Sequence, residues 1–257
     1  MKELDLTPYN ILRPEKLQWF FPLVGSEEEI LQNIKSKSLR SFLRKTENSL
    51  AEAGITWEQK WLTEQDFQAW LQYYKKKMVE QHFDIFATAA WYAEMISRGL
   101  TIGGIFLYQA EKLVGSAIYT QTADHGLITN HFKASEHLIG FRERNGSLGA
   151  LVDFIFLRES IKTGRPQIST GRARNATGVF NMYGYIDYKL RFGTYPACIE
   201  GIANLSTTPL SENGDVLFFG LHDNRLILVG CKKKGSEFEF KSSRFATESM
   251  PFMLIKY

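Results

Sequence analysis

The stretch that decides the fold class is TIGGIFLYQAEKLVGSAIYTQTADHGLITNHFKA, residues 101–134. It contains three short runs rich in Ile, Val, Tyr, Phe and Thr, and polar or glycine-containing turns separate these runs. Runs of β-branched and aromatic residues bounded by turn residues are typical of strands that pair with their neighbours in sequence. We therefore predict an antiparallel meander of three strands, Thr101–Gln109, Lys112–Gln121 and Gly126–Ala134.

Helical and extended segments alternate after this meander. Apolar residues recur at helical spacing from about Ser147 to Thr163, and Gly164 and Pro166 follow as stop signals. The residue types further predict a brief strand at Pro166–Thr170, a short helix at Thr177–Tyr188, a strand at Ala197–Asn204, a hairpin turning at Asp223–Asn224 and a last strand at Phe252–Lys256.

The first hundred residues show mainly the spacing of amphipathic helices. Apolar side chains recur every three or four residues from Phe67 to Met78, behind the capping pattern Thr63-x-x-Asp66. Helices, then antiparallel strands, then alternating elements predict an α+β fold built on a mixed sheet. We expect residues 1–100 to form a mainly helical N-terminal part, 101–204 the core of the domain and 205–257 a C-terminal β extension.

Composition narrows the class of protein. The 257 residues are 44% hydrophobic and 23% charged, which is typical of a folded globular chain. A formal net charge of +3 is too small to make nucleic acid the default partner, so we do not expect tRNA as a ligand. Cys198 and Cys231 form neither a CxxC pair nor a zinc spacing, and we predict no metal. The N-terminus lacks the apolar core of a signal peptide and the charge-free runs are too short for a bilayer, so we expect a cytoplasmic protein without a membrane span.

A glycine-containing loop, FRERNGSLGA at residues 141–150, opens the predicted helix at Ser147. The start of a helix exposes unpaired N–H groups and the positive end of the helix dipole, which together suit an anion. The alternative is an ordinary strand-to-helix turn whose glycines only permit the bend. The predicted cofactor-binding residues of this loop are Arg142, Arg144, Asn145, Gly146, Ser147, Leu148 and Gly149.

Four segments resemble the GNAT-type acyltransferase superfamily, especially its Fem-like and BioF2-like branch: the meander, RNGSLGALVDFIFLRESIKTG, PQISTG and YIDYKLRFGTYP. The resemblance covers about Ile102–Gly201 and implies a GNAT-like, mostly antiparallel mixed sheet flanked by helices. It also implies that backbone N–H groups bind the acyl carbonyl at a splay in the strand of roughly Leu127–Ala134. Gly146 and Gly149 are three residues apart, whereas two is usual in the superfamily, so a carrier-protein phosphopantetheine or an aminoacyl-tRNA stays open as the donor in place of free CoA.

Acyl transfer to an amine needs a base that takes a proton from the ammonium group. His131 lies on the predicted strand, and it is the first candidate because an imidazole titrates near neutral pH. Glu136 and His137 follow it as further catalytic candidates. The alternative is that His131 forms an ordinary hydrogen bond within the sheet and that Glu136 and His137 are solvated loop residues.

The segment after the next predicted strand supplies further candidates through the resemblance. It implies that Arg172, Arg174 and Asn175 contact the cofactor and that a tyrosine beyond them protonates the departing thiolate. Tyr183 is the preferred acid and Tyr185 is the second candidate. The alternatives are packing for the two tyrosines and solvated charge for the two arginines.

The resemblance implies one leading function and leaves two alternatives. The leading function is N-acyl transfer from acyl-CoA or an acyl-phosphopantetheine carrier protein to an amine or peptide acceptor. A fatty acyl group and the Lys or ornithine side chain of a ribosomally made lipopeptide, in natural-product biosynthesis, are the expected substrates. The alternatives are aminoacyl transfer from charged tRNA, as in Fem-like peptidyltransferases, and a non-catalytic binding module that keeps the fold.

Overall fold

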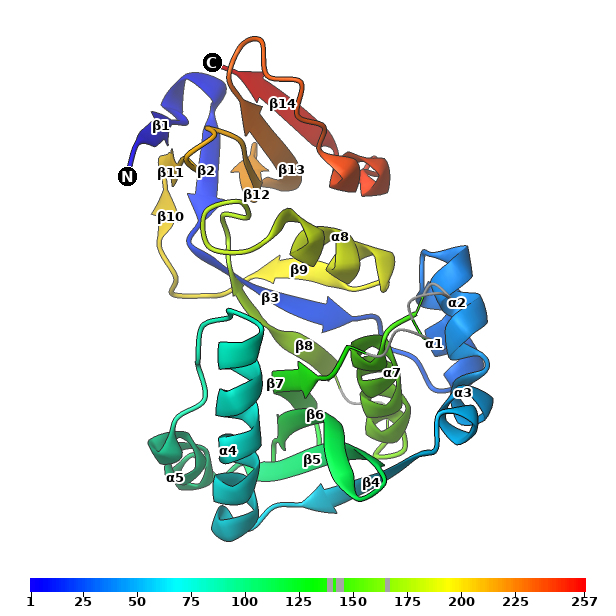
Figure 1. Cartoon of the computed structure of the whole chain (residues 1–257). Coiled ribbons are helices and arrows are strands. Elements are labelled where there is room, and N and C mark those ends of the chain that lie inside the picture. The colour runs from blue at the N-terminus through cyan, green and yellow to red at the C-terminus, as the bar shows by residue number, and fades with distance from the viewer. Residues whose placement is uncertain (138–140, 142–145, 165–166) are drawn as a thin grey trace. The chain divides into compact units, whose positions relative to one another are not determined.

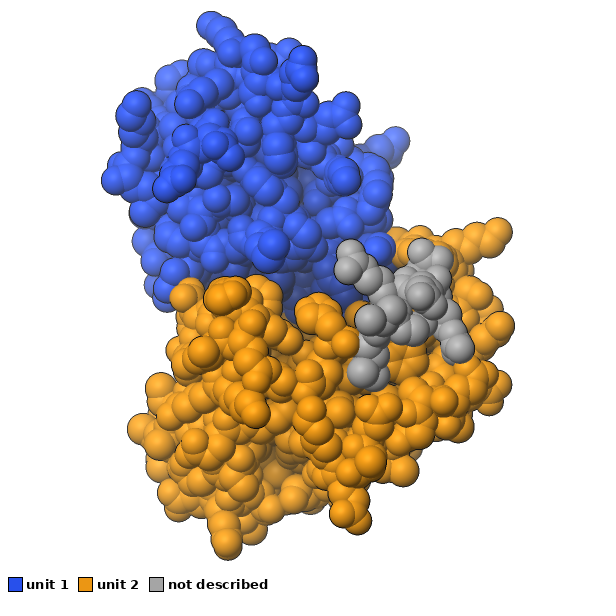
Figure 2. Space-filling model, in the orientation of Figure 1, with its two compact units in different colours: residues 1–19, 172–257 blue, residues 20–171 orange. Residues whose placement is uncertain are grey.

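A computed structural model describes residues 1–137, 141, 146–164 and 167–257. The chain forms two compact units, coloured separately in Figure 2. Unit 1 contains residues 1–19 and 172–257, and unit 2 contains residues 20–171. Both termini therefore belong to unit 1, and the whole of unit 2 is inserted between Trp19 and Arg172.

The sheet of unit 2 contains the predicted meander. Its strand order is β4-β5-β6-β7-β8, with antiparallel pairing from β4 to β7 and parallel pairing between β7 and β8 (Figure 1). These strands are β4 (Ile55–Trp61), β5 (Thr101–Gln109), β6 (Lys112–Gln121), β7 (Leu127–Ser135) and β8 (Gln167–Arg174, of which Gln167–Gly171 belong to unit 2). The three predicted strands are confirmed to within a residue at each end.

Helices cover both faces of this sheet. They are α1 (Glu27–Asn33), α2 (Lys37–Leu43), α3 (Thr46–Glu52), α4 (Glu64–Glu80), α5 (Ala89–Ser97) and α7 (Leu148–Ile161). Ile118 of β6 shares a core with Phe67 of α4, whereas the ring of Tyr119 packs against Phe156 of α7 with centroids 5.4 Å apart. Because successive strand residues point to opposite faces, α4 and α7 lie on opposite faces of the sheet.

The helix α4 forms as predicted. The Thr63 hydroxyl accepts from the N–H of Asp66, and the Asp66 carboxylate accepts from the N–H of Thr63, so both bonds of the capping box are present. Phe67, Trp70 and Leu71 on its inner face are buried. The 3.6-residue spacing of its apolar side chains therefore directs α4 onto the sheet.

The helical prediction for the first hundred residues is wrong in two places. Residues 1–21 form strands, and in Lys16–Phe21 buried residues alternate with less buried ones at the period of two that a strand requires. A further strand, β4, follows Gly54. The apolar spacing of Leu39, Phe42, Leu43 and Leu50 predicts one helix, but the chain forms two, because α2 ends at Leu43 and α3 begins at Thr46.

Unit 1 consists mainly of strands. β12 (Val216–His222) and β13 (Arg225–Lys232) form the predicted hairpin, and Asp223 and Asn224 adopt the positive φ values (49° and 61°) that a two-residue turn requires. The other elements are β1 (Glu3–Asp5), η1 (Thr7–Tyr9), β2 (Ile11–Pro14), β3 (Lys16–Phe21, which reaches the first residues of unit 2), α8 (Tyr183–Arg191), β9 (Tyr195–Cys198), β10 (Asn204–Leu205), β11 (Thr207–Pro209), η2 (Lys241–Phe245) and β14 (Phe252–Lys256).

Two predicted boundaries in unit 1 are corrected. The helix expected from Thr177 begins at Tyr183, because the backbone of Thr177 exchanges hydrogen bonds of 2.7 and 2.9 Å with Leu217 instead. The strand expected at Ala197–Asn204 is β9, which ends at Cys198, followed by a turn.

The fold class is confirmed as α+β, with mixed and mostly antiparallel sheets flanked by helices. Among the described residues, no helix combines the length and the apolar character needed to cross a bilayer.

Candidate functional site

The strands β7 and β8 separate partway along their length. Their parallel register pairs Leu127–Thr129 with Gln167–Ser169, and it ends there although β7 continues to Ser135. Where two parallel strands separate, the N–H and C=O groups on their facing edges no longer bond to each other. We call this region, from Asn130 and Thr170 onward, the strand split.

A close backbone contact lies at the start of the strand split. Gly171 has φ +102°, and a Cβ at this position would lie 3.0 Å from the carbonyl oxygen of Asn130. Its N–H donates to the hydroxyl of buried Ser169 over 3.2 Å. Glycine is therefore required at residue 171 both for its backbone conformation and for its closeness to β7.

β7 contains a bulge at the same level. Asn130 pairs with Tyr119 and Phe132 pairs with Ile118, so His131 is an extra residue on β7. His131 and Phe132 both contact the Trp91 ring, with centroids 5.1 and 4.9 Å apart, whereas neighbours on a regular strand point to opposite faces. The bulge therefore turns both side chains toward α5.

The imidazole of His131 is exposed and held in place. Its Nε2 lies 2.8 Å from the hydroxyl of Thr120, which is buried, and its ring meets Trp91 edge-on at 64°. The predicted base thus lies at the strand split, with one nitrogen hydrogen-bonded to β6. An exposed imidazole with this support can exchange a proton with a bound amine.

Aromatic and apolar side chains lie on the α4–α5 side of His131. The ring of Phe132 lies 5.7 Å from that of Tyr74, whose hydroxyl is 3.5 Å from the N–H of Phe86. Phe86 belongs to the linker between α4 and α5. The first residue of this linker is Gln81, whose side-chain amide donates to the carbonyl of Ser135 over 2.8 Å. Several apolar side chains near the end of α4 and in this linker are exposed. Their exposed fractions are 64% for Val79, 50% for Phe83, 44% for Ile85 and 60% for Phe86.

Glu136, at the end of β7, forms ion pairs. One of its oxygens lies 2.7 Å from Lys77 Nζ and 3.4 Å from Lys112 Nζ. Burial alone would raise the pKa of Glu136, but the hydrogen bonds and charges of the two lysines lower it. These contacts favour an ionised, structural carboxylate, and the catalytic role predicted for Glu136 stays a prediction. His137 is exposed beside it, and its role also stays a prediction.

The start of α7 lies beside the end of β7. Ser147 caps the helix by accepting from the N–H of Ala150 over 3.1 Å, and within the described residues the N–H groups of Leu148 and Gly149 have no acceptor. A Cβ on Gly149 would lie 3.2 Å from the hydroxyl of Ser135. The structure therefore supplies two N–H groups at the positive end of a helix dipole near the strand split.

Of the remaining predicted loop residues, the structure describes only Gly146. Gly146 precedes the cap, and a Cβ there would meet the Phe42 ring at 2.3 Å, so this glycine permits close packing against α2. Arg142, Arg144 and Asn145 lie outside the described residues, and their predicted role in anion binding stays a prediction.

The other predicted cofactor contacts belong to unit 1. Asn175 is buried, where its amide donates to the carbonyls of Pro14 and Phe219, both over 2.7 Å, and accepts from the N–H of Phe219. Arg172 is exposed, and the Arg174 guanidinium lies 5.2 Å from the centre of the Phe180 ring. The contacts of Asn175 favour a structural role, whereas the two arginines keep exposed positions.

The two candidate tyrosines also belong to unit 1. The Tyr183 hydroxyl donates to the carbonyl of Asp215, and its ring lies 4.6 Å from that of Phe238. Burial raises the pKa of the Tyr183 phenol to about 12. Tyr185 packs edge-on against Trp19 at 6.3 Å, and Lys189 Nζ lies 5.6 Å from its ring centre. The structure favours packing for Tyr183, and its role as the acid stays a prediction.

Three further residues shape this region and were not predicted from the sequence. Thr120, Trp91 and Gly171 position His131 or the strand split, yet each lies on a different element. Gly171 carried a usable signal, because a glycine at the end of a strand suggests a close backbone approach. The roles of Thr120 and Trp91 depend on the bulge, which has no local signature in the sequence.

Comparison with known proteins supports the fold. No protein-family model matches the chain, and no curated protein is significantly similar to it in sequence. The crystal structure of FemX matches with a TM-score of 0.54 at 11% identity, over 78% of this chain and 64% of FemX. The putative lysylphosphatidylglycerol synthetase C-terminal domain from Agrobacterium fabrum gives 0.43 at 13% identity, over 76% of this chain and 59% of that one. The chain thus spans less than two thirds of the length of either structure.

Proposed function

We propose that this chain, whose fold is GNAT-like and Fem-like, transfers an acyl group from an activated donor to an amine. The observation that carries the proposal is the strand split with His131 on a bulge beside it. Such a split offers backbone groups to an acyl carbonyl, and the bulge supplies a base within the same region.

His131 is the base in this proposal. Its imidazole takes a proton from the acceptor ammonium, and the free amine attacks the acyl carbon. Backbone N–H groups at the strand split stabilise the charge that develops on the carbonyl oxygen. The C–N bond forms, the bond between the acyl carbon and the donor breaks, and the departing group takes up a proton. Thr120 orients the ring through its 2.8 Å contact with Nε2.

A thioester, either acyl-CoA or an acyl-phosphopantetheine, is the proposed donor. The N–H groups of Leu148 and Gly149 support this choice, because they suit a phosphate close to the end of β7. The proposal also includes the cytoplasmic location that the sequence predicts.

A long acyl chain is the proposed cargo. The exposed apolar side chains of Val79, Phe83, Ile85 and Phe86 support it, because several such residues along one short segment are unusual on a surface that faces only water. The proposed acceptor is an amine of the Lys or ornithine side-chain type, within a peptide of the lipopeptide class. Such an amine is protonated at neutral pH, which explains the need for a base.

A second candidate is aminoacyl transfer from charged tRNA. The similarity of the fold to FemX favours it, because the Fem-like resemblance implies that kind of donor. A non-catalytic module is the third reading, and loss of activity in a single His131 variant would exclude it.

Thiol release from a series of acyl-CoA donors, measured with a panel of amines that includes Nα-acetyl-lysine amide, tests the proposal. His131→Ala is expected to lower turnover by about 10²–10⁴-fold. Thr120→Val should give a smaller loss by freeing the ring. His125→Ala is the matched control, since His125 is also an exposed histidine of this sheet but lies in the β6–β7 turn, bonded to Gln121. Normal turnover in His131→Ala would contradict the proposed mechanism.

A further inference from the structure

A cavity of about 550 Å³ lies between α2 and α3 in unit 2. Its described lining residues are polar or charged, except for one aromatic residue. The lining includes Ser38, Ser41, Phe42, Lys45, Asn48 and Glu52. Hydroxyl, amide and carboxylate groups around an aromatic side chain can hydrogen-bond a sugar and the edge of a base.

Phe42 connects this cavity to the start of α7. Its ring forms part of the cavity wall and also packs against Gly146, one residue before the cap Ser147. It lies 5.8 Å from the Phe141 ring, edge to face. The cavity and the N–H groups of Leu148 and Gly149 therefore lie on two sides of one buried side chain.

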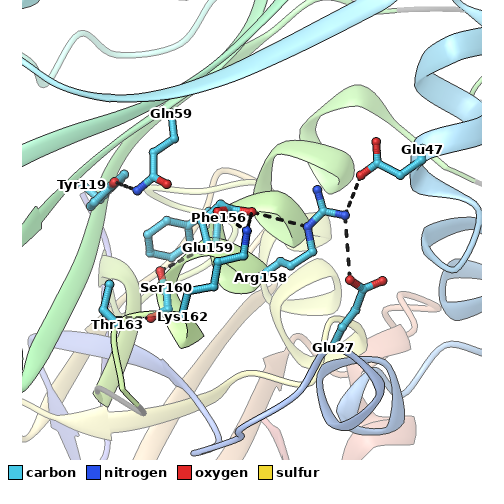
Figure 3. Close-up of polar contacts among 10 residues, drawn as sticks. All are labelled: Glu27, Glu47, Gln59, Tyr119, Phe156, Arg158, Glu159, Ser160, Lys162 and Thr163. Carbon is cyan, nitrogen blue, oxygen red and sulfur yellow. Dashed lines mark hydrogen bonds and ion pairs between the residues drawn. The ribbon is translucent and has the colours of Figure 1, made fainter.

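Arg158 of α7 contacts α3, which forms one wall of the cavity, and also α1. Figure 3 shows its guanidinium between Glu47 of α3, at 2.6 Å, and Glu27 of α1, at 3.8 Å. The same group lies 5.3 Å from the centre of the Trp57 ring on β4. Arg158 is 13% exposed, whereas its partners Glu47 and Glu27 are 63% and 47% exposed, so these ion pairs lie at the surface of the molecule.

Lys45 and Glu52 are the two charged residues in the described lining of the cavity. Arg44 is paired with Glu28, and Glu47 is engaged by Arg158. Within the described part of the chain, Lys37 and Lys45 form no ion pair, and Lys45 lines the cavity. An ammonium group in this position favours a phosphate.

We infer that the α2–α3 cavity binds a phosphorylated nucleoside, which is the carrier end of the donor. This inference rests on the proposed acyl transfer. Lys45 contacts a phosphate, Asn48 and the two serines contact the sugar and base edges, and the reactive end extends past Phe42 toward the strand split. Two kinds of donor carry such a group: CoA has a 3′-phosphoadenosine diphosphate, and a charged tRNA has a terminal adenosine.

Direct binding tests this site without requiring turnover. Titration calorimetry with 3′,5′-adenosine bisphosphate, CoA and 4′-phosphopantetheine should show that the first two bind and that the third binds more weakly than CoA. Lys45→Ala should weaken binding of the bisphosphate about tenfold or more. Ser41→Trp should abolish it by filling the cavity. Lys75→Ala is the matched control, since it removes an exposed lysine from α4 and should change nothing.

The trinucleotide CCA identifies the source of the nucleoside. Competition by CCA with the bisphosphate supports the inference and points to tRNA, whereas CoA competing alone supports it and points to a thioester. Absence of binding by every nucleotide, or phosphopantetheine binding as tightly as CoA, overturns it. If Lys45→Ala transfers acyl groups with unchanged KM, the inference fails and the proposed function stands. If Lys45-dependent nucleotide binding occurs but no donor supports transfer, the proposed function fails instead.

Discussion

Tyr183 has contacts that constrain its role. Its phenol donates to the carbonyl of Asp215, which also accepts from the Ser211 hydroxyl over 2.6 Å. With a pKa raised to about 12, this phenol is a weaker acid than an exposed tyrosine. Proton donation to a thiolate would therefore require Tyr183 to leave its hydrogen bond and to act against its raised pKa.

We expect Tyr183→Phe to lower stability by about 1 kcal/mol, the usual worth of one hydrogen bond, and to keep near-normal turnover. Turnover at saturating donor and melting temperature should be compared for Tyr183→Phe and Tyr185→Phe. A fall in turnover of about 10²-fold or more in Tyr183→Phe alone, at normal stability, would restore the acid role predicted from the sequence.

Glu136 makes part of the stability depend on pH. Its pKa is lower in the folded chain than the ordinary 4.5, so its contribution is present above that value and is lost as the pH falls through the folded pKa. Glu136→Gln should reduce stability at neutral pH by about 1–3 kcal/mol, because buried Lys77 loses one of its two carboxylate partners and keeps only Glu80.

Denaturant unfolding at a series of pH values measures this effect. The difference between wild type and Glu136→Gln should shrink as the pH falls below the ordinary Glu value. Glu94→Gln serves as the control, since Glu94 forms a pair with Arg98 in which both side chains are exposed, and such pairs contribute about 0–1 kcal/mol. A difference that does not vary with pH would contradict the assignment.

At the level of elements, the strand split depends on β8 approaching β7 at one glycine. Gly171→Ala should lower stability by about 1–3 kcal/mol through its φ of +102°, with an additional loss from the 3.0 Å contact to Asn130. Gly164→Ala provides a matched control, because Gly164 has φ +108° and no neighbour within 4 Å of a Cβ. Equal losses in the two variants, measured by thermal unfolding, would show that β8 does not approach β7 this closely.

For the whole molecule, net charge bears on the choice of donor. Non-specific affinity for tRNA comes mainly from neutralised phosphates and decreases steeply with salt, and this chain has a net charge of only +3. We expect bulk tRNA to bind more weakly than about micromolar at physiological salt, as measured by filter retention. Tighter retention together with a tRNA-dependent product would make aminoacyl transfer the leading function.

Patterns among consecutive residues determined much of the fold. The meander, α4, α7 and the β12–β13 hairpin match the predictions because alternation, helical spacing, caps and turn residues are local properties. The strands β1–β3 were missed, because short runs such as Lys16–Phe21 mix polar and aromatic residues and resemble neither template over enough length. The break between α2 and α3 was missed for a different reason, because Leu39, Phe42, Leu43 and Leu50 also have the spacing of one continuous helix.

The sequence by itself determined the α+β class, the strand that contains His131 and the helix that begins after Ser147. Tertiary structure alone decided that His131 lies on a bulge, that β7 and β8 separate beside it, and that Arg158 in the last turn of α7 pairs with Glu47 of α3. It also decided that Asn175 and Glu136 are engaged in internal contacts. The reason is physical: periodicity arises between neighbours in the chain, whereas strand register, ion pairs and cavities depend on residues that only folding brings together.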